Sequence, residues 1–224
     1  MKTSAIALPA LLLALAVPLA ACGDDDGPNS AVDPGSSSSD EPDAPDTLAP
    51  PNAVPAAPGP VRSRFLPTVM DTGDGAELCL GAVAESYPPQ CGGPAITNWD
   101  WDSESLQGIF DEQGDIRWGT FAVTGTWDGT AFTVTDAIPG PLYDPMPEEP
   151  VVLPDPSVDY SQSELDDIST SLDEELPGYQ GSYADQEGHV LVDVLYDDGS
   201  IQDYVDAAYG DGVVVVIGGL VDVD

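Results

Sequence analysis

The chain has 224 residues, and its 41 acidic residues against four basic ones give a formal net charge of −37 at pH 7. A surface with this charge repels nucleic acids and anionic lipid headgroups, so the composition excludes nucleic acid as a partner. The acids are spread along the chain, which is typical of a highly soluble surface in a salty or acidic-proteome host. Attraction of cations such as Ca²⁺, or of a basic partner, is the functional alternative.

The first residues divide in the way that an export signal does. Lys2 supplies a positive charge, and residues 5–21 form an apolar run that contains two prolines. The run is short for a membrane-spanning helix, and the prolines weaken that interpretation further. At its end, Leu19-Ala20-Ala21-Cys22 resembles a bacterial lipobox. The resemblance implies a signal peptide over 1–21 and a lipidated N-terminal Cys22.

A lipidated Cys22 makes the membrane a partner of the protein, because acyl chains bury in the bilayer and hold the chain on the outer face of the cell membrane. The alternative is an ordinary secretory signal that is cut near Ala21, with Cys22 incidental.

Composition divides the rest of the chain. Residues 22–60 contain almost no large apolar side chain, which predicts a disordered acidic and proline-rich tether. Residues 136–158 are dense in proline, which predicts a linker because proline disfavours helices and central strands. We therefore expect an α+β fold with a β-rich module over 61–135 and a small α/β module over 159–224.

Cys79 and Cys91 are an even pair once Cys22 is lipidated, and an oxidising compartment favours a disulfide between them. Closing so short a loop should stabilise the fold by roughly 3 kcal/mol. A redox site would have the closer C-x-x-C spacing, and a zinc site would need further ligands. The pair predicts a structural disulfide.

The β-rich module contains two local signals. Residues 77–83 are a short strand candidate that holds Cys79. Asp128-Gly129 predicts a two-residue hairpin turn between strands 121–127 and 130–134. Together with the disulfide these signals predict a small barrel-like sheet.

The hairpin predicts a register as well. A two-residue turn makes Val123 face Val134 and puts Phe132 opposite Gly125. Gly119 is a bulge candidate, because regular alternation would put the side chains of Trp118 and Phe121 on opposite faces of the strand.

The second module changes to a helical period. Ser161-x-x-Glu164 resembles a capping box, and apolar residues follow at helical spacing until Pro177-Gly178. Residues 189–196 alternate and predict a strand, whereas 213–217 and 220–223 are apolar strand candidates.

Between these strands, Ile201, Tyr204, Val205 and Ala208 recur at helical spacing, which predicts a helix. The alternative is a hairpin turn at Asp198-Gly199 followed by a strand over 201–207. The first interpretation gives the order α-β-α-β, with both helices on one face of a small sheet.

Four short segments resemble uncharacterised exported proteins of actinobacteria. These are Leu78-Cys79-Leu80-Gly81, the run from Pro88 to Pro94, Trp99 to Trp101, and Trp127 to Gly129. The resemblance implies a cysteine-bounded loop and carries no activity. The α-β-α-β order is also similar to that of small secreted pro-domains and inhibitors, in topology alone.

The sequence offers little catalytic equipment. His189 is the single histidine, so any Ser-His-Asp or Cys-His device would have to use it. The chain has no G-x-S-x-G elbow and no glycine-rich phosphate cradle, and its many acids make any chosen carboxylate pair arbitrary. We expect no catalytic residues, no cofactor and no enzymatic activity.

Metal and glycan binding are the remaining candidates. Asp100, Asp102 and Glu104 alternate like calcium ligands, but Ser105 and Asp111 fit an EF-hand loop poorly. A second loose cluster contains Asp71, Asp74 and Glu77. Because chance clusters are expected among so many acids, we expect ions to act by screening charge and predict no metal site.

Trp99 and Trp101 share a face if their segment is extended, with Asp100 and Asp102 on the other face. Exposed, the two rings could stack against a sugar of the cell wall, which makes them candidate ligand-stacking residues. Buried, they would belong to the core, where small β modules usually place tryptophan. A cell-wall or protein partner therefore remains the alternative to a protein with no ligand.

Overall fold

The computed structural model describes residues 49–103, 105–106, 108–145 and 153–223. The predicted signal peptide, the lipobox and most of the tether lie outside the described residues. No helix of the described part has the length and apolar character needed to cross a membrane.

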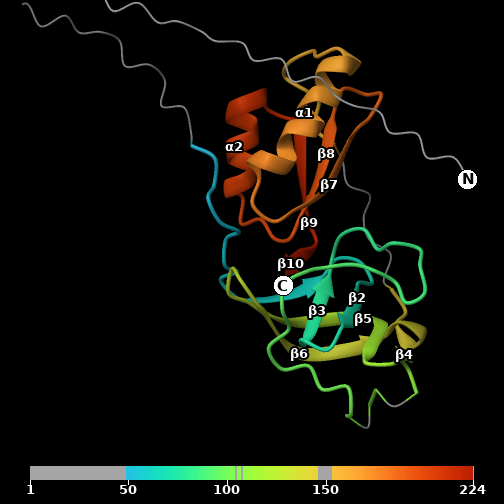
Figure 1. The fold of residues 1–224 in the computed structure, drawn as a ribbon. Coiled ribbons are helices and arrows are strands. Elements are labelled where there is room, and N and C mark those ends of the chain that lie inside the picture. The colour runs from blue at the N-terminus through green and yellow to red at the C-terminus, as the bar shows by residue number, and fades with distance from the viewer. Residues whose placement is uncertain (1–48, 104, 107, 146–152, 224) are drawn as a thin grey trace, which may run out of the picture. The chain divides into compact units, whose positions relative to one another are not determined.

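Two α-helices and ten strands occur in the described residues, together with the short 3₁₀ helix Gly140–Leu142, which confirms the α+β class (Figure 1). The elements are β1 (Pro60–Ser63), β2 (Thr68–Asp71), β3 (Ala76–Cys79), β4 (Asp111–Gln113), β5 (Ile116–Trp127), β6 (Phe132–Pro139), α1 (Gln162–Glu175), β7 (Tyr179–Ala184), β8 (Val190–Val194), α2 (Ser200–Tyr209), β9 (Val214–Gly218) and β10 (Leu220–Asp222).

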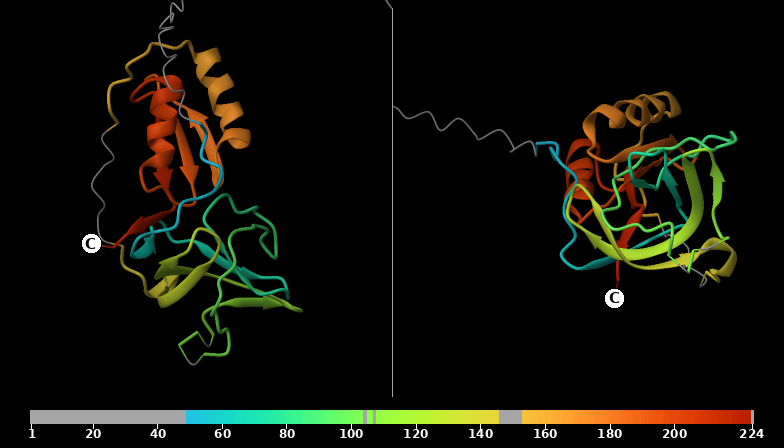
Figure 2. Two further views of the ribbon diagram at one scale, coloured as in Figure 1. Left: turned by 90° about the vertical axis from the view of Figure 1, so that its left-hand side faces the viewer. Right: turned by 60° about the horizontal axis from the view of Figure 1, so that its bottom comes forward.

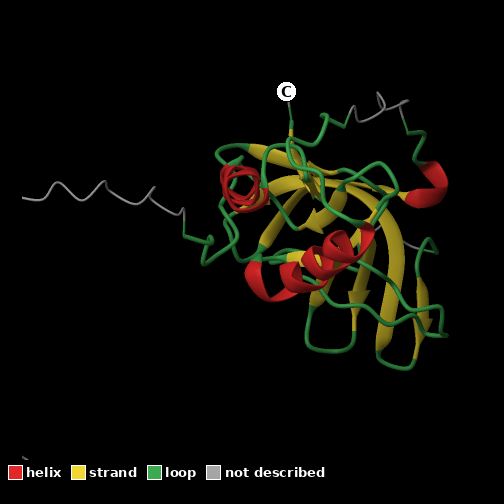
Figure 3. Cartoon of the chain, turned by 90° about the horizontal axis from the view of Figure 1, so that it is seen from above, coloured by secondary structure: helices red, strands yellow, loops and turns green. Residues whose placement is uncertain are grey.

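The long strand β5 organises a sheet of seven strands. One edge of β5 pairs with β1 and β2, the other with β4 and β6, and β10 and β3 complete the path β10-β1-β5-β2-β3. The partners of β5 differ at its two ends, and the sheet curls into a half-barrel (Figures 2 and 3). The core inside the curl is rich in rings, with Trp101, Phe121, Trp127 and Phe132 all buried.

The predicted hairpin register was wrong by two residues. Gly125 pairs with Val134 and Trp127 pairs with Phe132, so the connection is a four-residue loop. Asp128 shapes this four-residue loop, because its Oδ1 accepts hydrogen bonds from the backbone N–H groups of Thr130 and Ala131, both at 2.8 Å. A shift of two residues preserves the faces of the strands, so the Phe132 ring still lies against Gly125.

The bulge lies elsewhere than predicted. Gly119 pairs regularly with Val69, whereas the β5–β6 register shifts between Thr124 and Gly125. The prediction assumed that Trp118 must share a face with Phe121. Trp118 is instead buried on the opposite face, in a cluster of its own under the disulfide. Alternation therefore needed no correction at Gly119.

The C-terminal region follows the helical and strand periods closely. Ser161 and Glu164 form the predicted capping box, and Glu164 Oε2 accepts the Ser161 backbone N–H at 2.8 Å. The helix predicted over 201–208 is confirmed as α2, so the alternative strand there was wrong. Strand β7 was not predicted from the sequence. It pairs antiparallel with β8, and β8 pairs parallel with β9.

Both helices cover the same face of this three-stranded sheet. The valines 190, 192 and 194 of β8 form one apolar row, and they share a single core cluster with the buried residues of α1 and α2. The chain uses aliphatic side chains here almost throughout.

The step from β9 to β10 joins the two sheets. Gly219 alone separates β9 from β10, and β10 pairs antiparallel with β1, so Val61 lies opposite Asp222. Leu220 and Tyr196 are buried in the ring-rich core of the curled sheet. The boundaries drawn from composition also differ from the contacts, because Val54 and Ala57 of the expected tether pack on that core and β6 extends to Pro139.

Candidate functional site

The two candidate ligand-stacking residues, Trp99 and Trp101, occupy different environments. Trp101 is 5% exposed and its indole N–H donates to Asp71 Oδ2 at 3.2 Å, so its ring belongs to the core. Trp118 is 7% exposed. Trp99 is only partly buried, and its ring meets that of Trp101 edge-on at 5.4 Å. The two rings therefore do not form a flat exposed row.

Trp99 lies at the border between core and solvent. Its ring centroid is 4.9 Å from that of Phe121, in an edge-to-face contact that holds the indole in place. The Trp99 indole N–H is buried and has no hydrogen-bond acceptor among the described residues. The part of the side chain that remains accessible is therefore the apolar ring.

A cavity of about 390 Å³ opens beside Trp99. Two carboxylate residues, Asp100 and Asp136, line it. Further lining is provided by three hydroxyl and three aliphatic residues, Ser103, Ser105, Thr135, Leu106, Val134 and Ala137. An aromatic ring surrounded by carboxylates and hydroxyls can bind a small polar ligand that has an apolar face.

The walls of this cavity are fastened by Asn98. Its Nδ2 donates to the Val134 carbonyl at 2.7 Å, and its Oδ1 accepts the Val134 N–H at 2.8 Å. The hydroxyls of Thr97 and Thr133 lie 2.7 Å apart beside it. These bonds fix the Trp99 segment against β6, so the cavity is formed by two segments that are distant in the sequence.

The carboxylates nominated as calcium ligands are engaged in local structure. Asp100 Oδ1 accepts the backbone N–H of Asp102 at 3.0 Å, and Asp102 lies 3.8 Å from Arg117 Nη1. Glu104 lies outside the described residues. Asp71 Oδ1 accepts the Gly73 N–H at 2.8 Å and so shapes the β2–β3 turn. Among the described residues, no group of three or more His, Cys, Asp or Glu side chains is placed to hold a metal ion.

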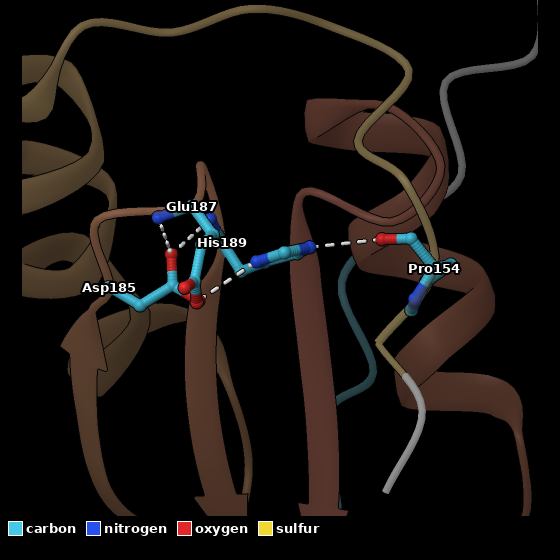
Figure 4. A network of polar contacts seen from close by, with 4 residues as sticks. All are labelled: Pro154, Asp185, Glu187 and His189. Carbon is cyan, nitrogen blue, oxygen red and sulfur yellow. Dashed lines mark hydrogen bonds and ion pairs between the residues drawn. The ribbon is translucent and has the colours of Figure 1, made fainter.

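His189 is the centre of a separate polar network (Figure 4). It is 6% exposed, with Nδ1 2.8 Å from Asp185 Oδ2 and Nε2 2.9 Å from the Pro154 carbonyl. A carbonyl and a carboxylate can only accept, so both hydrogen bonds are made at once when both ring nitrogens carry protons, which is the imidazolium form.

The electrostatics of this network agree with its geometry. Burial alone lowers the pKa of His189, but the hydrogen bond to the Pro154 carbonyl and the bond and charge of Asp185 outweigh it, so the pKa is raised. Burial likewise acts to raise the pKa of Asp185. The hydrogen bonds that its carboxylate accepts from N–H groups outweigh this effect, so the pKa is lowered overall. Neither ring nitrogen is left to act as a base.

The predicted disulfide is confirmed. Cys79 and Cys91 are bonded with their Cα atoms 5.9 Å apart, and Cys79 packs with Met70 and Trp118 beneath the sheet. Strand β3 ends at Cys79, so the chain from Leu80 to Gln90 is an irregular loop closed by the bond.

Comparisons of the chain with protein-family models, with curated proteins and with solved structures found no match.

Proposed function

We propose that this chain is a lipoprotein that is anchored through Cys22, faces outside the cytoplasm and has no enzymatic activity. The lipobox-like Leu19-Ala20-Ala21-Cys22 and the acidic tether behind it support the anchor. In this proposal residues 1–21 are a signal peptide, and the tether runs from Cys22 to the residues that pack on the core from Val54 onward. A barrel-like module from β1 to β6, a proline-rich linker and an α/β module with the order α-β-β-α-β follow.

One observation carries the non-enzymatic part of the proposal. His189 is the single histidine of the chain, and both of its ring nitrogens donate to structural partners. In a catalytic triad the second nitrogen would be directed at a nucleophile, whereas here it is directed at the Pro154 carbonyl. The residue thus ties the proline-rich segment to the β7–β8 hairpin.

Membrane fractionation tests the anchor. The wild-type chain should sediment with membranes, and Cys22→Ser should move it to the soluble fraction, because the thiol that receives the lipid is lost. The matched control is Cys79→Ser/Cys91→Ser, which removes cysteines without touching Cys22 and should stay with membranes. A Cys22→Ser protein that remains in the membrane fraction would sink the proposal.

A second candidate function is binding of a cell-wall glycan in the cavity beside Trp99. A cavity of about 390 Å³ holds a sugar ring, the indole offers an apolar surface, and Asp100 and Asp136 can accept its hydroxyl protons. Soluble disaccharide fragments of the wall should bind in titrations followed by NMR. Trp99→Ala should weaken binding by about tenfold, since stacking contributes about 1 kcal/mol or more. Trp118→Phe, on the other face, is the control, and equal effects of the two variants contradict the assignment.

Calcium binding is the weakest candidate. We propose that Ca²⁺ acts on this chain by screening its acids, an effect that NaCl should reproduce because exposed charges respond to ionic strength. Calorimetry in physiological salt should show no saturable micromolar binding. A sharp isotherm that is abolished by Asp100→Ala or Asp102→Ala would contradict this.

A further inference from the structure

The loop between Cys79 and Cys91 is a surface feature that none of the functions above uses. Its ends are held together by the disulfide, which packs in the cluster of Met70 and Trp118. The returning chain continues beside β3, where the Leu78 N–H donates to the Pro94 carbonyl at 2.9 Å. Such a loop starts and ends on a rigid sheet.

The tip of the loop is held by its own hydrogen bonds. The Ala84 N–H donates to the Gln90 carbonyl at 2.9 Å, and the Ser86 N–H donates to the Ala84 carbonyl at 2.8 Å. The Ser86 hydroxyl donates to the Pro88 carbonyl at 2.8 Å and accepts from Gln90 Nε2 at 3.1 Å. The tip is therefore preformed, which lowers the entropy cost of binding.

Two side chains of this tip are presented to solvent. The Ser86 N–H bond to Ala84 closes a three-residue turn with the exposed Glu85 at its apex. Tyr87 is 72% exposed, although its ring packs edge-on against Trp118 at a centroid distance of 5.3 Å. An exposed tyrosine held in one position is typical of the residues that dominate binding energies at interfaces.

We propose that the loop from Val83 to Gln90 binds in the active-site cleft of a serine endopeptidase that cleaves after glutamate, and inhibits it as a slowly turned-over substrate. Glu85 fills the specificity pocket, and the bond between Glu85 and Ser86 is the one attacked. Two later bonds of the tip, Tyr87–Pro88 and Pro88–Pro89, end in proline nitrogens, which have no N–H to offer the cleft. A pocket for glutamate is basic, so the charge of −37 favours the encounter.

The disulfide and the hydrogen bonds of Ser86 explain why the peptidase would be inhibited by the loop and would cleave it only slowly. Attack of the peptidase serine on the Glu85 carbonyl forms an ester at Glu85 and breaks the bond to Ser86, whose nitrogen leaves as an amine with the serine proton. The disulfide keeps the two fragments covalently joined, and the Ser86 hydroxyl bonds hold the amine close to the ester. Attack by this amine reforms the peptide bond and returns the proton to the serine.

The inference extends the proposed non-enzymatic, binding role to a partner, and it does not depend on the lipid anchor. The test uses the full-length protein in mild detergent, a glutamate-specific serine endopeptidase and trypsin. Wild type should inhibit the glutamate-specific enzyme with a constant below about 1 μM, within the range of preformed protease–inhibitor complexes. Glu85→Lys should lose this inhibition by about 100-fold and gain inhibition of trypsin, because the pocket residue is changed.

A second variant tests the loop architecture. Ser86→Ala should still bind the glutamate-specific peptidase at first. The peptidase should then cleave it about tenfold faster, since the variant loses the hydrogen bonds that retain the amine. Peptide mapping should confirm the disulfide in every variant. Rapid cleavage of the wild type without inhibition overturns the proposal. It is also overturned if Glu85→Lys leaves the inhibition of the glutamate-specific peptidase and of trypsin the same as with the wild type. Membrane fractionation of Glu85→Lys should be unchanged, so a failure here is distinct from a failure of the lipid anchor.

Discussion

The curled sheet and the C-terminal α/β region build their cores from different materials. The first packs rings edge to face, as Trp101 and Phe121 do at 6.2 Å, and adds a disulfide. The second packs valine, leucine and isoleucine between two helices and three strands. Rings can fill an irregular space between short strands, whereas small branched side chains need the regular spacing that helices and parallel strands provide.

In both regions, which contain few basic side chains, carboxylates accept hydrogen bonds from N–H and O–H groups. Their aspartates accept backbone N–H groups at turns, as Asp128 does before β6 and Asp197 does at the start of α2. Glu175 accepts the hydroxyl protons of Tyr204 and Tyr209 at 3.1 and 2.7 Å. An acidic chain can therefore hold these turns through hydrogen bonds to its carboxylates, and the difference between the regions lies in their cores.

The largest expected effect breaks one core at a time. Phe121→Ala should lower the free energy of unfolding by about 3–5 kcal/mol, because a fully buried ring leaves a cavity. Leu172→Ala is the matched change in the aliphatic core, with an expected loss of about 2–5 kcal/mol. In urea, both variants should shift one common transition, since β10 joins the sheets. Two transitions, each moved by one variant, would show that the cores unfold separately.

Removal of the disulfide tests how far the ring core depends on its covalent link. Cys79→Ser/Cys91→Ser should lose roughly 3 kcal/mol, the value expected for closing a loop of this length. Thermal unfolding with and without reductant measures it. Reductant should destabilise the wild type and leave the double variant unchanged. A reductant effect on the double variant would point to another cause.

The His189 network allows a sharper test in the α/β region. His189→Gln should cost about 1.5–3 kcal/mol near pH 6, because charge-assisted hydrogen bonds are lost. The raised pKa of His189 means that its contribution is present below the ordinary value of 6.5 and is lost as the pH rises through the folded value. The lowered pKa of Asp185 makes its contribution present above 3.8 and lost in acid.

The difference in stability between wild type and His189→Gln should therefore be largest between about pH 4 and 6.5 and shrink on either side. Urea unfolding across this range measures it. A difference that grows above pH 8 would mean that the ring is neutral in the folded protein.

The smallest expected effect concerns the connection between the regions. The Tyr196 hydroxyl donates to Asp222 at 3.0 Å, while its ring is buried in the ring-rich core. Tyr196→Phe keeps the ring and should cost about 1 kcal/mol, the usual net value of one hydrogen bond. Asp222→Asn is the matched control, because an amide can still accept the proton and should cost less. Unfolding midpoints in urea compare the two.

The regularity of each region decided how much of its fold could be predicted. In the α/β region the capping box at Ser161 and the apolar spacing from Ile201 to Ala208 predicted both helices, because local periodicity determined them. Strand β7 was missed, since its sequence around Gly181 is polar and it is a strand through its pairing with β8. The hairpin register was missed because the Asp128 carboxylate, and not the Asp-Gly pair alone, shapes the loop.

The candidate sites were predictable only in their local parts. The sequence indicated Trp99 and the pairing of Cys79 with Cys91. It contained no signal that Asp136, assigned by composition to a linker, would line the cavity beside Trp99, because that position depends on the pairing of β6 with β5. The hydrogen bonds of Ser86 within the loop are likewise a product of three-dimensional structure.

The pairing of β1 with β10 has a consequence for how the chain reaches this structure. Val61 and Asp222 are partners in one ladder, so the curled sheet cannot close until almost the whole described chain has been synthesised. Pairings between residues so distant along the chain form slowly, because a large loop must be ordered before any contact is gained. The export that we propose for this chain would benefit from this delay, since a half-made sheet lacks the strand that completes it.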